Sequence, residues 1–116
     1  MGVRKKASTY SLNEQFITEC DLTYAVNMLA GRWKLQLLAR LSKKTYRFHE
    51  LSEAYPHITE RMLSMQLKAL EQDGLVIRTV YAEVPPRVEY TLTERAVELM
   101  PILDRLSAWG KKQRGK

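Results

Sequence analysis

The chain has 116 residues, of which 45% are apolar and 28% charged, and this suits one globular domain with a modest core. It has no apolar run of about 18 residues, so we expect no transmembrane helix and no membrane partner. The first ten residues also lack an apolar stretch, so we expect no secretory signal. The single cysteine, Cys20, cannot form an internal disulfide, and a cytoplasmic location is therefore expected.

The net charge of +6 is unevenly distributed along the chain. Seven positive charges lie in two terminal segments, at positions 4–6 and 111–116, and without them the remainder carries −1. Residues 32–47 nevertheless contain six Lys and Arg side chains and no acid. Because docking onto phosphate groups requires one basic surface rather than a high total charge, this distribution favours a nucleic-acid partner.

Three helices are predicted in the first half of the chain. Asp21 is typical of an N-cap, Gly31 ends the first helix, and its apolar positions are Leu22, Ala25, Val26 and Leu29. The second helix follows at once, and its buried face consists of Trp33, Leu37, Leu38 and Leu41. The third is short, carries Phe48, Leu51 and Tyr55, and stops at Pro56, since proline disfavours helical geometry in the residue before it.

The next helix has clear signals at both ends. Thr59 is a good N-cap, and Ile58 before it can pack on Leu63 as a hydrophobic staple. Gly74 closes the helix, and the next residue, Leu75, can contact the last turn as in a Schellman motif. The buried stripe of this helix is Leu63, Leu67 and Leu70.

The apolar period then changes from helical spacing to two. Residues 75–81 and 88–92 alternate across a connector that contains Pro85 and Pro86, which predicts an antiparallel hairpin. Thr93 caps a last helix that Gly110 ends, and Pro101 inside it predicts a kink.

This order of elements predicts a helix-turn-helix followed by a wing. The short helix from Phe48 and the helix from Thr59 form the motif, and the hairpin is the wing. A helix fits the major groove of B-DNA, and any surface helix also turns polar residues outward, so the pattern alone leaves both interpretations open. The hairpin and the basic run favour DNA, and the candidate contacts are Arg47, Thr59, Arg61, Ser64, Met65, Lys68 and Arg87. Arg87, beside the two prolines of the wing, could also be a solvated turn residue.

From Cys20 to Gly110 the chain resembles the HxlR-type winged helix-turn-helix regulators. The matching stretches are Gly31 to Lys34, Arg47 to Leu51, Ile58 to Leu63, Gln66 to Lys68, Glu71 to Leu75 and, most specifically, Glu83 to Glu94. The resemblance implies a mostly helical α+β fold and a homodimer that binds a specific double-stranded DNA site and represses or activates nearby genes. It also implies dimerisation helices at both ends of the chain, and the predicted interface residues are Leu99, Leu103, Leu106 and Trp109.

We accordingly expect residues 1–20 to form a partly flexible arm, 21–110 the winged domain and 111–116 a basic tail. The chain departs from its relatives in carrying Asp21 where a proline often follows the cysteine, and Ala96 near a usual glycine. Neither position touches the elements expected to read DNA.

In some relatives a cysteine matching Cys20 senses oxidants or electrophiles, which implies a possible redox or small-molecule effector here. The reactive form is the thiolate, which the following helix N-terminus favours and the carboxylate of Asp21 opposes. The alternative is a structural cysteine at the dimer interface.

Two other classes of protein compete with a regulator. The histidines, His49 and His57, have no partner at metal-ligand spacing, and no catalytic set stands out, so we expect no enzyme, metal or cofactor. A winged-helix protein-interaction module without specific DNA binding is the main alternative, and Arg61 and Lys68 argue against it. A MarR-type regulator shares the wing but is expected to be longer.

Overall fold

The computed structural model describes residues 20–115, which contain five helices and three strands. Compact packing divides the chain into one unit up to Arg32 and a second from Trp33 onward. The predicted N-terminal arm lies outside the described residues except for Cys20. The helices are α2 (Asp21–Leu29), α3 (Lys34–Leu41), α4 (Phe48–Ala54), α5 (Glu60–Gln72) and α6 (Glu94–Arg114), and the strands are β1 (Tyr46–Arg47), β2 (Val76–Tyr81) and β3 (Arg87–Leu92). The predicted winged helix-turn-helix fold is confirmed.

In the first unit, α2 begins one residue earlier than the sequence indicates. Cys20 is the N-cap, with extended backbone, and its carbonyl accepts a hydrogen bond from the N–H of Tyr24 at 2.8 Å. The expected cap, Asp21, is therefore the first helical residue, where its carboxylate still favours the positive end of the helix dipole. Gly31 follows the end of α2 with φ of +133°, a conformation that L side chains rarely adopt.

Leucines from three helices, α3, α4 and α5, form the core of the second unit. Full burial of each such side chain contributes about 1.5–3 kcal/mol. Trp33 was predicted on the buried face of α3, but it is the residue before the helix and is only half-buried. The fully buried large side chains are Leu37, Leu38, Leu51, Leu63, Leu67 and Leu70.

Both predicted ends of α5 are confirmed. The hydroxyl of Thr59 accepts a hydrogen bond from the N–H of Met62 at 3.1 Å. At the other end, Gly74 has φ of +74° and its N–H donates to the carbonyl of Glu71 at 3.0 Å. The N–H of Leu75 donates to the carbonyl of Leu70 at 2.9 Å, which completes a Schellman motif. Local chemistry thus sets the length and position of α5.

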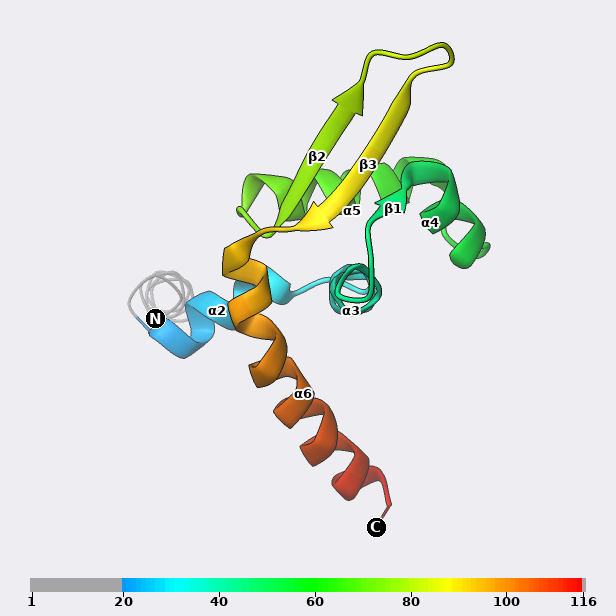
Figure 1. The fold of residues 1–116 in the computed structure, drawn as a ribbon. Helices are drawn as coiled ribbons and strands as arrows, with labels where there is room; N and C mark the ends of the chain where they lie inside the picture. The colour runs from blue at the N-terminus through cyan, green and yellow to red at the C-terminus, as the bar shows by residue number, and fades with distance from the viewer. Residues whose placement is uncertain (1–19, 116) are drawn as a thin grey trace, which may run out of the picture. The chain divides into compact units, whose positions relative to one another are not determined.

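The wing, which comprises β2, β3 and the connection 82–86, belongs to a three-stranded antiparallel sheet of order β1-β3-β2. The sequence predicted only the hairpin, and the missed strand is β1, which pairs Tyr46 with Tyr90 and Arg47 with Glu89. Two residues are too few to show an alternating pattern. In Figure 1, β1 lies beside β3 and α5 lies behind the hairpin.

The last helix, α6, begins where predicted and ends later. The hydroxyl of Thr93 accepts from the N–H of Ala96 at 3.2 Å and donates to the carbonyl of Gly74 at 2.6 Å. Gly110 was predicted to end α6, but the helix continues to Arg114. Because Lys111, Lys112 and Arg114 lie in its last turn, they interact favourably with the negative end of the helix dipole. Most of the expected basic tail is therefore helical.

Candidate nucleic-acid interface

The outward face of α5 carries the predicted contact residues. Arg61, Met65 and Lys68 are spaced by four and three residues, so they lie on one side of the helix, and all three are exposed. Ser64 is exposed beside them, and Thr59 is exposed at the N-cap. The opposite side is the buried leucine stripe. α5 therefore presents a mixed, partly cationic surface from a rigidly packed helix.

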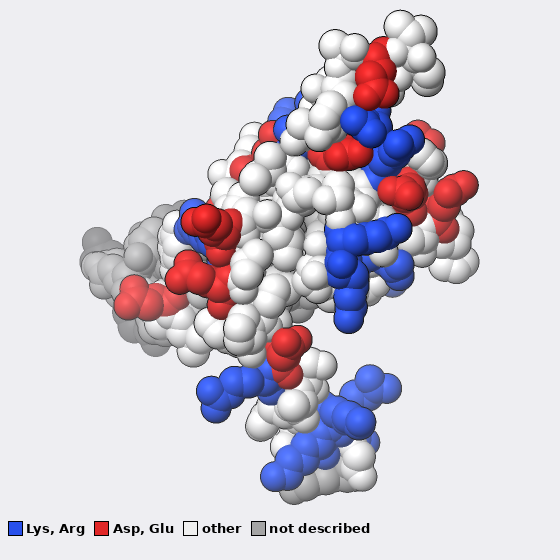
Figure 2. Space-filling model, in the orientation of Figure 1, with Lys and Arg blue, Asp and Glu red and all other residues white. Residues whose placement is uncertain are grey.

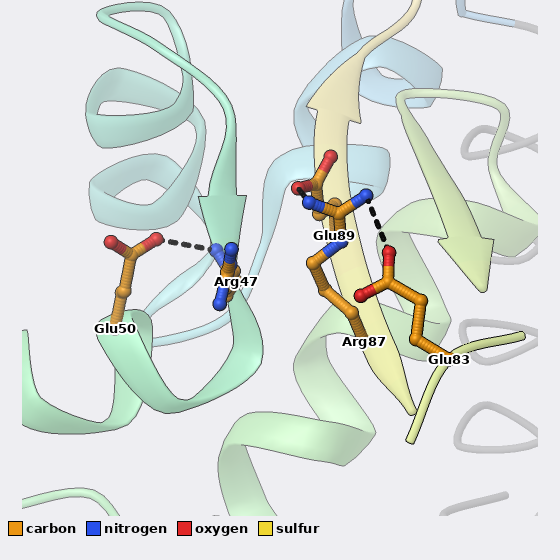
Figure 3. A network of polar contacts seen from close by, with 5 residues as sticks. All are labelled: Arg47, Glu50, Glu83, Arg87 and Glu89. Atoms are coloured by element: carbon orange, nitrogen blue, oxygen red, sulfur yellow. Dashed lines mark hydrogen bonds and ion pairs between the residues drawn. The ribbon is translucent and has the colours of Figure 1, made fainter. Parts of the chain in front are cut away.

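Arg47 is the last residue of β1 and the N-cap of α4, with an exposed side chain. Its backbone N–H donates to Oε1 of Glu50 at 2.8 Å, and this hydrogen bond is the main cause that lowers the pKa of the Glu50 carboxyl (Figure 3). Arg47 also lies opposite Glu89 in the β1–β3 register. Its position is thus fixed by a helix cap on one side and by a strand pair on the other.

Arg87 is the first residue of β3 and is not a free cation at the tip of the wing. Its Nη2 lies 3.1 Å from Oε2 of Glu83, and its Nη1 lies 3.5 Å from Oε2 of Glu89. The guanidinium also stacks over the ring of Tyr81, 4.0 Å from the ring centre. Figure 3 shows the two carboxylates on either side of the guanidinium. The role of Arg87 as a phosphate contact remains a prediction.

Three residues in the wing were not singled out from the sequence. Arg78 is exposed on β2 and shares a face with the buried Val76, because strand side chains alternate. Glu83 and Glu89 are the partners of Arg87. Glu89 could have been found from its position two residues after Arg87 in a strand, whereas Glu83 reaches Arg87 only through the folded connection.

A second group of cations surrounds the end of α3. Figure 2 shows Lys and Arg gathered there and along the last part of α6, whereas blue and red alternate around the wing. Nε of Arg40 donates to the hydroxyl of Tyr55 at 3.1 Å, and that hydroxyl donates to the carbonyl of Gln36 at 3.1 Å. Nζ of Lys44 lies 4.9 Å from the ring centre of Tyr46. Arg40 therefore joins α3 to α4, the first helix of the motif.

The outer side of α6 is apolar. Ile102, Leu106 and Trp109 are 61%, 55% and 62% exposed and recur at helical spacing. Leu99 and Leu103 are half-buried. A groove of about 480 Å³ between α3 and α6 is lined by the apolar Leu35, Ala39, Met100, Leu103 and Leu106 and by the polar Gln36, Ser42, Lys43, Asp104 and Ser107. Large apolar side chains exposed in a row mark a surface suited to another protein.

In the first unit, Cys20 lies at the start of α2. Hydrogen bonds from Thr23, first from its hydroxyl and then from its N–H, lower the pKa of the Cys20 thiol, and the N–H of Leu22 adds to this. The carboxylate of Asp21 acts in the opposite direction. The helix end therefore favours the thiolate despite its acidic neighbour.

Within residues 20–115, no helix has the length and apolar character needed to cross a membrane. In the same range, no three His, Cys, Asp or Glu side chains gather as a metal ion would require.

The family model, the relatives and the solved structures that this chain resembles are all helix-turn-helix or regulatory proteins. The model of the HxlR-like helix-turn-helix family matches residues 28–116. An uncharacterized HTH-type transcriptional regulator of Methanothermobacter thermautotrophicus is 49% identical over 92 residues, which are 79% of this chain and 70% of the relative. YdeP of Bacillus subtilis, an uncharacterized HTH-type transcriptional regulator, is 39% identical over all of this chain and 89% of its own. The solved structure of the redox regulator HypR in its reduced form has a TM-score of 0.76 at 41% identity, over 80% of this chain and 92% of HypR.

Proposed function

The chain belongs to the HxlR-like helix-turn-helix family of transcription regulators, and we propose that it binds a specific double-stranded DNA site as a homodimer with α5 in the major groove. The observation that carries this proposal is the two-sided character of α5. Its leucine side is fully buried, and its other side presents Arg61, Ser64, Met65 and Lys68 to solvent. A helix about 10–12 Å across fits a groove about 12 Å wide.

The residue types suggest separate roles within this interface. Arg61 and Lys68 can donate to the major-groove edge of guanine, and Met65 can contact the methyl group of thymine. Thr59, Ser64, Arg47 and Arg87 suit the phosphate backbone, which sets the register of the protein on the duplex.

The direct test is binding to the promoter region beside the protein's own gene, measured by fluorescence anisotropy against an unrelated duplex. Arg61→Ala should weaken specific binding by about 1–3 kcal/mol and relax one base preference. Arg105→Ala, an exposed arginine on α6, is the matched control and should leave affinity unchanged. Wild-type affinity in Arg61→Ala would contradict the assignment of that residue.

A salt titration separates DNA binding from the alternative protein-interaction module. Phosphate contacts release counterions, so the affinity of a DNA-binding protein falls steeply as salt rises. Absence of binding to either duplex at low salt would favour the interaction module.

We also propose that Cys20 is a redox-responsive thiol. The lowered pKa of Cys20 supports this, as does the similarity to HypR, a redox regulator. Diamide should release the promoter duplex from the wild type and not from Cys20→Ser, and dithiothreitol should restore binding. Equal sensitivity of both proteins would contradict a role for Cys20.

The pH dependence of the thiol provides a second measurement. A lowered pKa increases the thiolate fraction near neutral pH, and the hydroxyl of Thr23 is the largest cause. Thr23→Val removes this donor, so the pKa should rise and the iodoacetamide reaction should begin at higher pH. An unchanged pH profile would show that the hydroxyl does not set the pKa.

A further inference from the structure

Arg87 of the wing lies between two acidic side chains and an aromatic ring. Nη1 and Nη2 of Arg87 each point to a different carboxylate, and the face of the guanidinium lies on Tyr81. Its Nε is buried and has no hydrogen-bond acceptor among the described residues. The two carboxylates compensate the charge of the guanidinium, so Arg87 attracts DNA phosphates less while both are in place.

The two carboxylates differ in how firmly they are placed. Glu89 is a residue of β3, its side chain is 20% exposed, and it lies in register with Arg47 and Thr79 on either side. Glu83 lies in the connection between β2 and β3, its side chain is 51% exposed, and its contact with Arg87 is the shorter of the two. The side chain of Glu83 can therefore move away from Arg87 more freely than that of Glu89.

A cleft of about 380 Å³ lies beside this pair, between the start of α4 and the β2–β3 connection. Arg47, His49 and Arg87 line it, and Glu83 contributes the single carboxylate among the described residues that do so. Figure 3 shows Arg47 and Arg87 on neighbouring strands with Glu83 alongside Arg87. The two arginines make the cleft suited to an anion. In the free protein, Glu83 already pairs with Arg87, one of the cations that would bind it.

We propose that Glu83 is an internal competitor for the DNA backbone: its carboxylate holds Arg87 in the free protein, and a backbone phosphate replaces it in the complex. Phosphate and carboxylate oxygens accept the same charge-assisted hydrogen bonds from a guanidinium, so the exchange preserves the contacts of Arg87. The inference rests on the proposed DNA-binding function and assigns Glu83 a role within it. Its consequence is weaker binding to arbitrary DNA, because each duplex must first displace Glu83.

The test measures anisotropy of a fluorescein-labelled random-sequence duplex over a range of salt concentrations. Glu83→Gln should bind this duplex roughly 3–10-fold more tightly at low salt, with a salt slope close to that of the wild type, because the phosphate contact of Arg87 forms in both complexes. Arg87→Gln should bind more weakly than the wild type. Glu98→Gln removes an exposed carboxylate of α6, outside the wing, and should change affinity little.

A double variant separates exchange from simple loss of negative charge. In the Arg87→Gln background there is no guanidinium to release, so Glu83→Gln should add less than about a twofold gain. An equal gain in both backgrounds would overturn the proposal, as would unchanged or weaker binding by Glu83→Gln alone. Because Glu83 is an exposed connection residue, the variant should melt at the wild-type temperature. If the wild type bound neither the random nor the promoter duplex, the proposed function itself would fail.

Discussion

The two longest described helices, α5 and α6, differ in how far their apolar sides are buried within the chain. α5 has 13 residues and buries three leucines within its own chain, and its outward side is polar. α6 has 21 residues, buries only Ala96, and turns large apolar side chains outward. The apolar side of α5 is therefore fully buried within the chain, and its mostly polar side is suited to nucleic acid. The apolar side of α6 remains exposed in the single chain and is suited to contact with another protein.

Under the proposed function, this difference gives α5 and α6 separate tasks. A helix that reads DNA must be held rigidly, because base-edge hydrogen bonds require fixed side-chain positions. The caps and the leucine stripe of α5 supply that rigidity. A dimerisation helix requires instead an exposed self-complementary surface, since a two-fold interface uses the same patch on both copies. Ile102, Leu106 and Trp109 on α6 have this character.

The largest effect is expected from charges on the apolar side of α6. Leu106→Asp combined with Trp109→Asp should dissociate the proposed homodimer, because an uncompensated buried charge costs about 3–5 kcal/mol. The dimer Kd should rise by more than about 100-fold, which sedimentation equilibrium would measure. Both side chains are more than half exposed in the single chain, so the variant should keep its helical circular dichroism.

The matched control for that variant is Ala108→Asp. At about 100° per residue, position 108 lies on the opposite side of α6 from Leu99 and Leu106, so its carboxylate should not enter the interface. Dissociation by Ala108→Asp, or a stable dimer of the double variant, would contradict the proposed interface and the contrast between the helices.

The second effect tests the inner side of α5. Leu67 is fully buried, so Leu67→Ala should lower the free energy of unfolding by about 2–5 kcal/mol. Met65 lies on the outer side and is 55% exposed, so Met65→Ala should change it by less than about 0.5 kcal/mol. Urea denaturation measures both. Similar losses at the two positions would mean that α5 is not two-sided in solution.

Sequence reasoning succeeded where the signals are local. Thr59 and Gly74 set the ends of α5 through hydrogen bonds within a few residues, so a pattern search finds them. Strand β1 exists only because a distant strand pairs with it, and its two residues carry no periodicity. Likewise, the contact of Glu83 with Arg87 depends on how the connection folds. The exposed faces of α5 and α6 could therefore be predicted from the sequence, whereas the ion pairs of the wing could not.

The third effect compares the two threonine caps. Thr59 accepts one hydrogen bond, whereas Thr93 accepts one and also donates to the carbonyl of Gly74, the residue that closes α5. Thr59→Ala should cost about 1 kcal/mol. Thr93→Ala should cost about 1 kcal/mol more, because it also leaves the carbonyl of Gly74 without its donor. The corresponding serine variants keep both hydroxyls and should lose little. Equal losses in the two alanine variants would show that Thr93 does not link α5 to α6.

The smallest effect decides where α6 ends. Gly110 lies inside the helix, and apart from its chain neighbours and the helix's own backbone no described heavy atom lies within 4 Å of the position that a Cβ would take. Gly110→Ala should therefore stabilise the protein by about 0.5–1 kcal/mol, since glycine in a helix interior is less favourable than alanine. If Gly110 instead ended the helix in a left-handed conformation, the same substitution would destabilise it, because Cβ disfavours that conformation. Gly74→Ala is the reference for that second case, with φ of +74°. The sign of the change in melting temperature therefore shows whether the cations after Gly110 belong to the helix that carries the apolar surface.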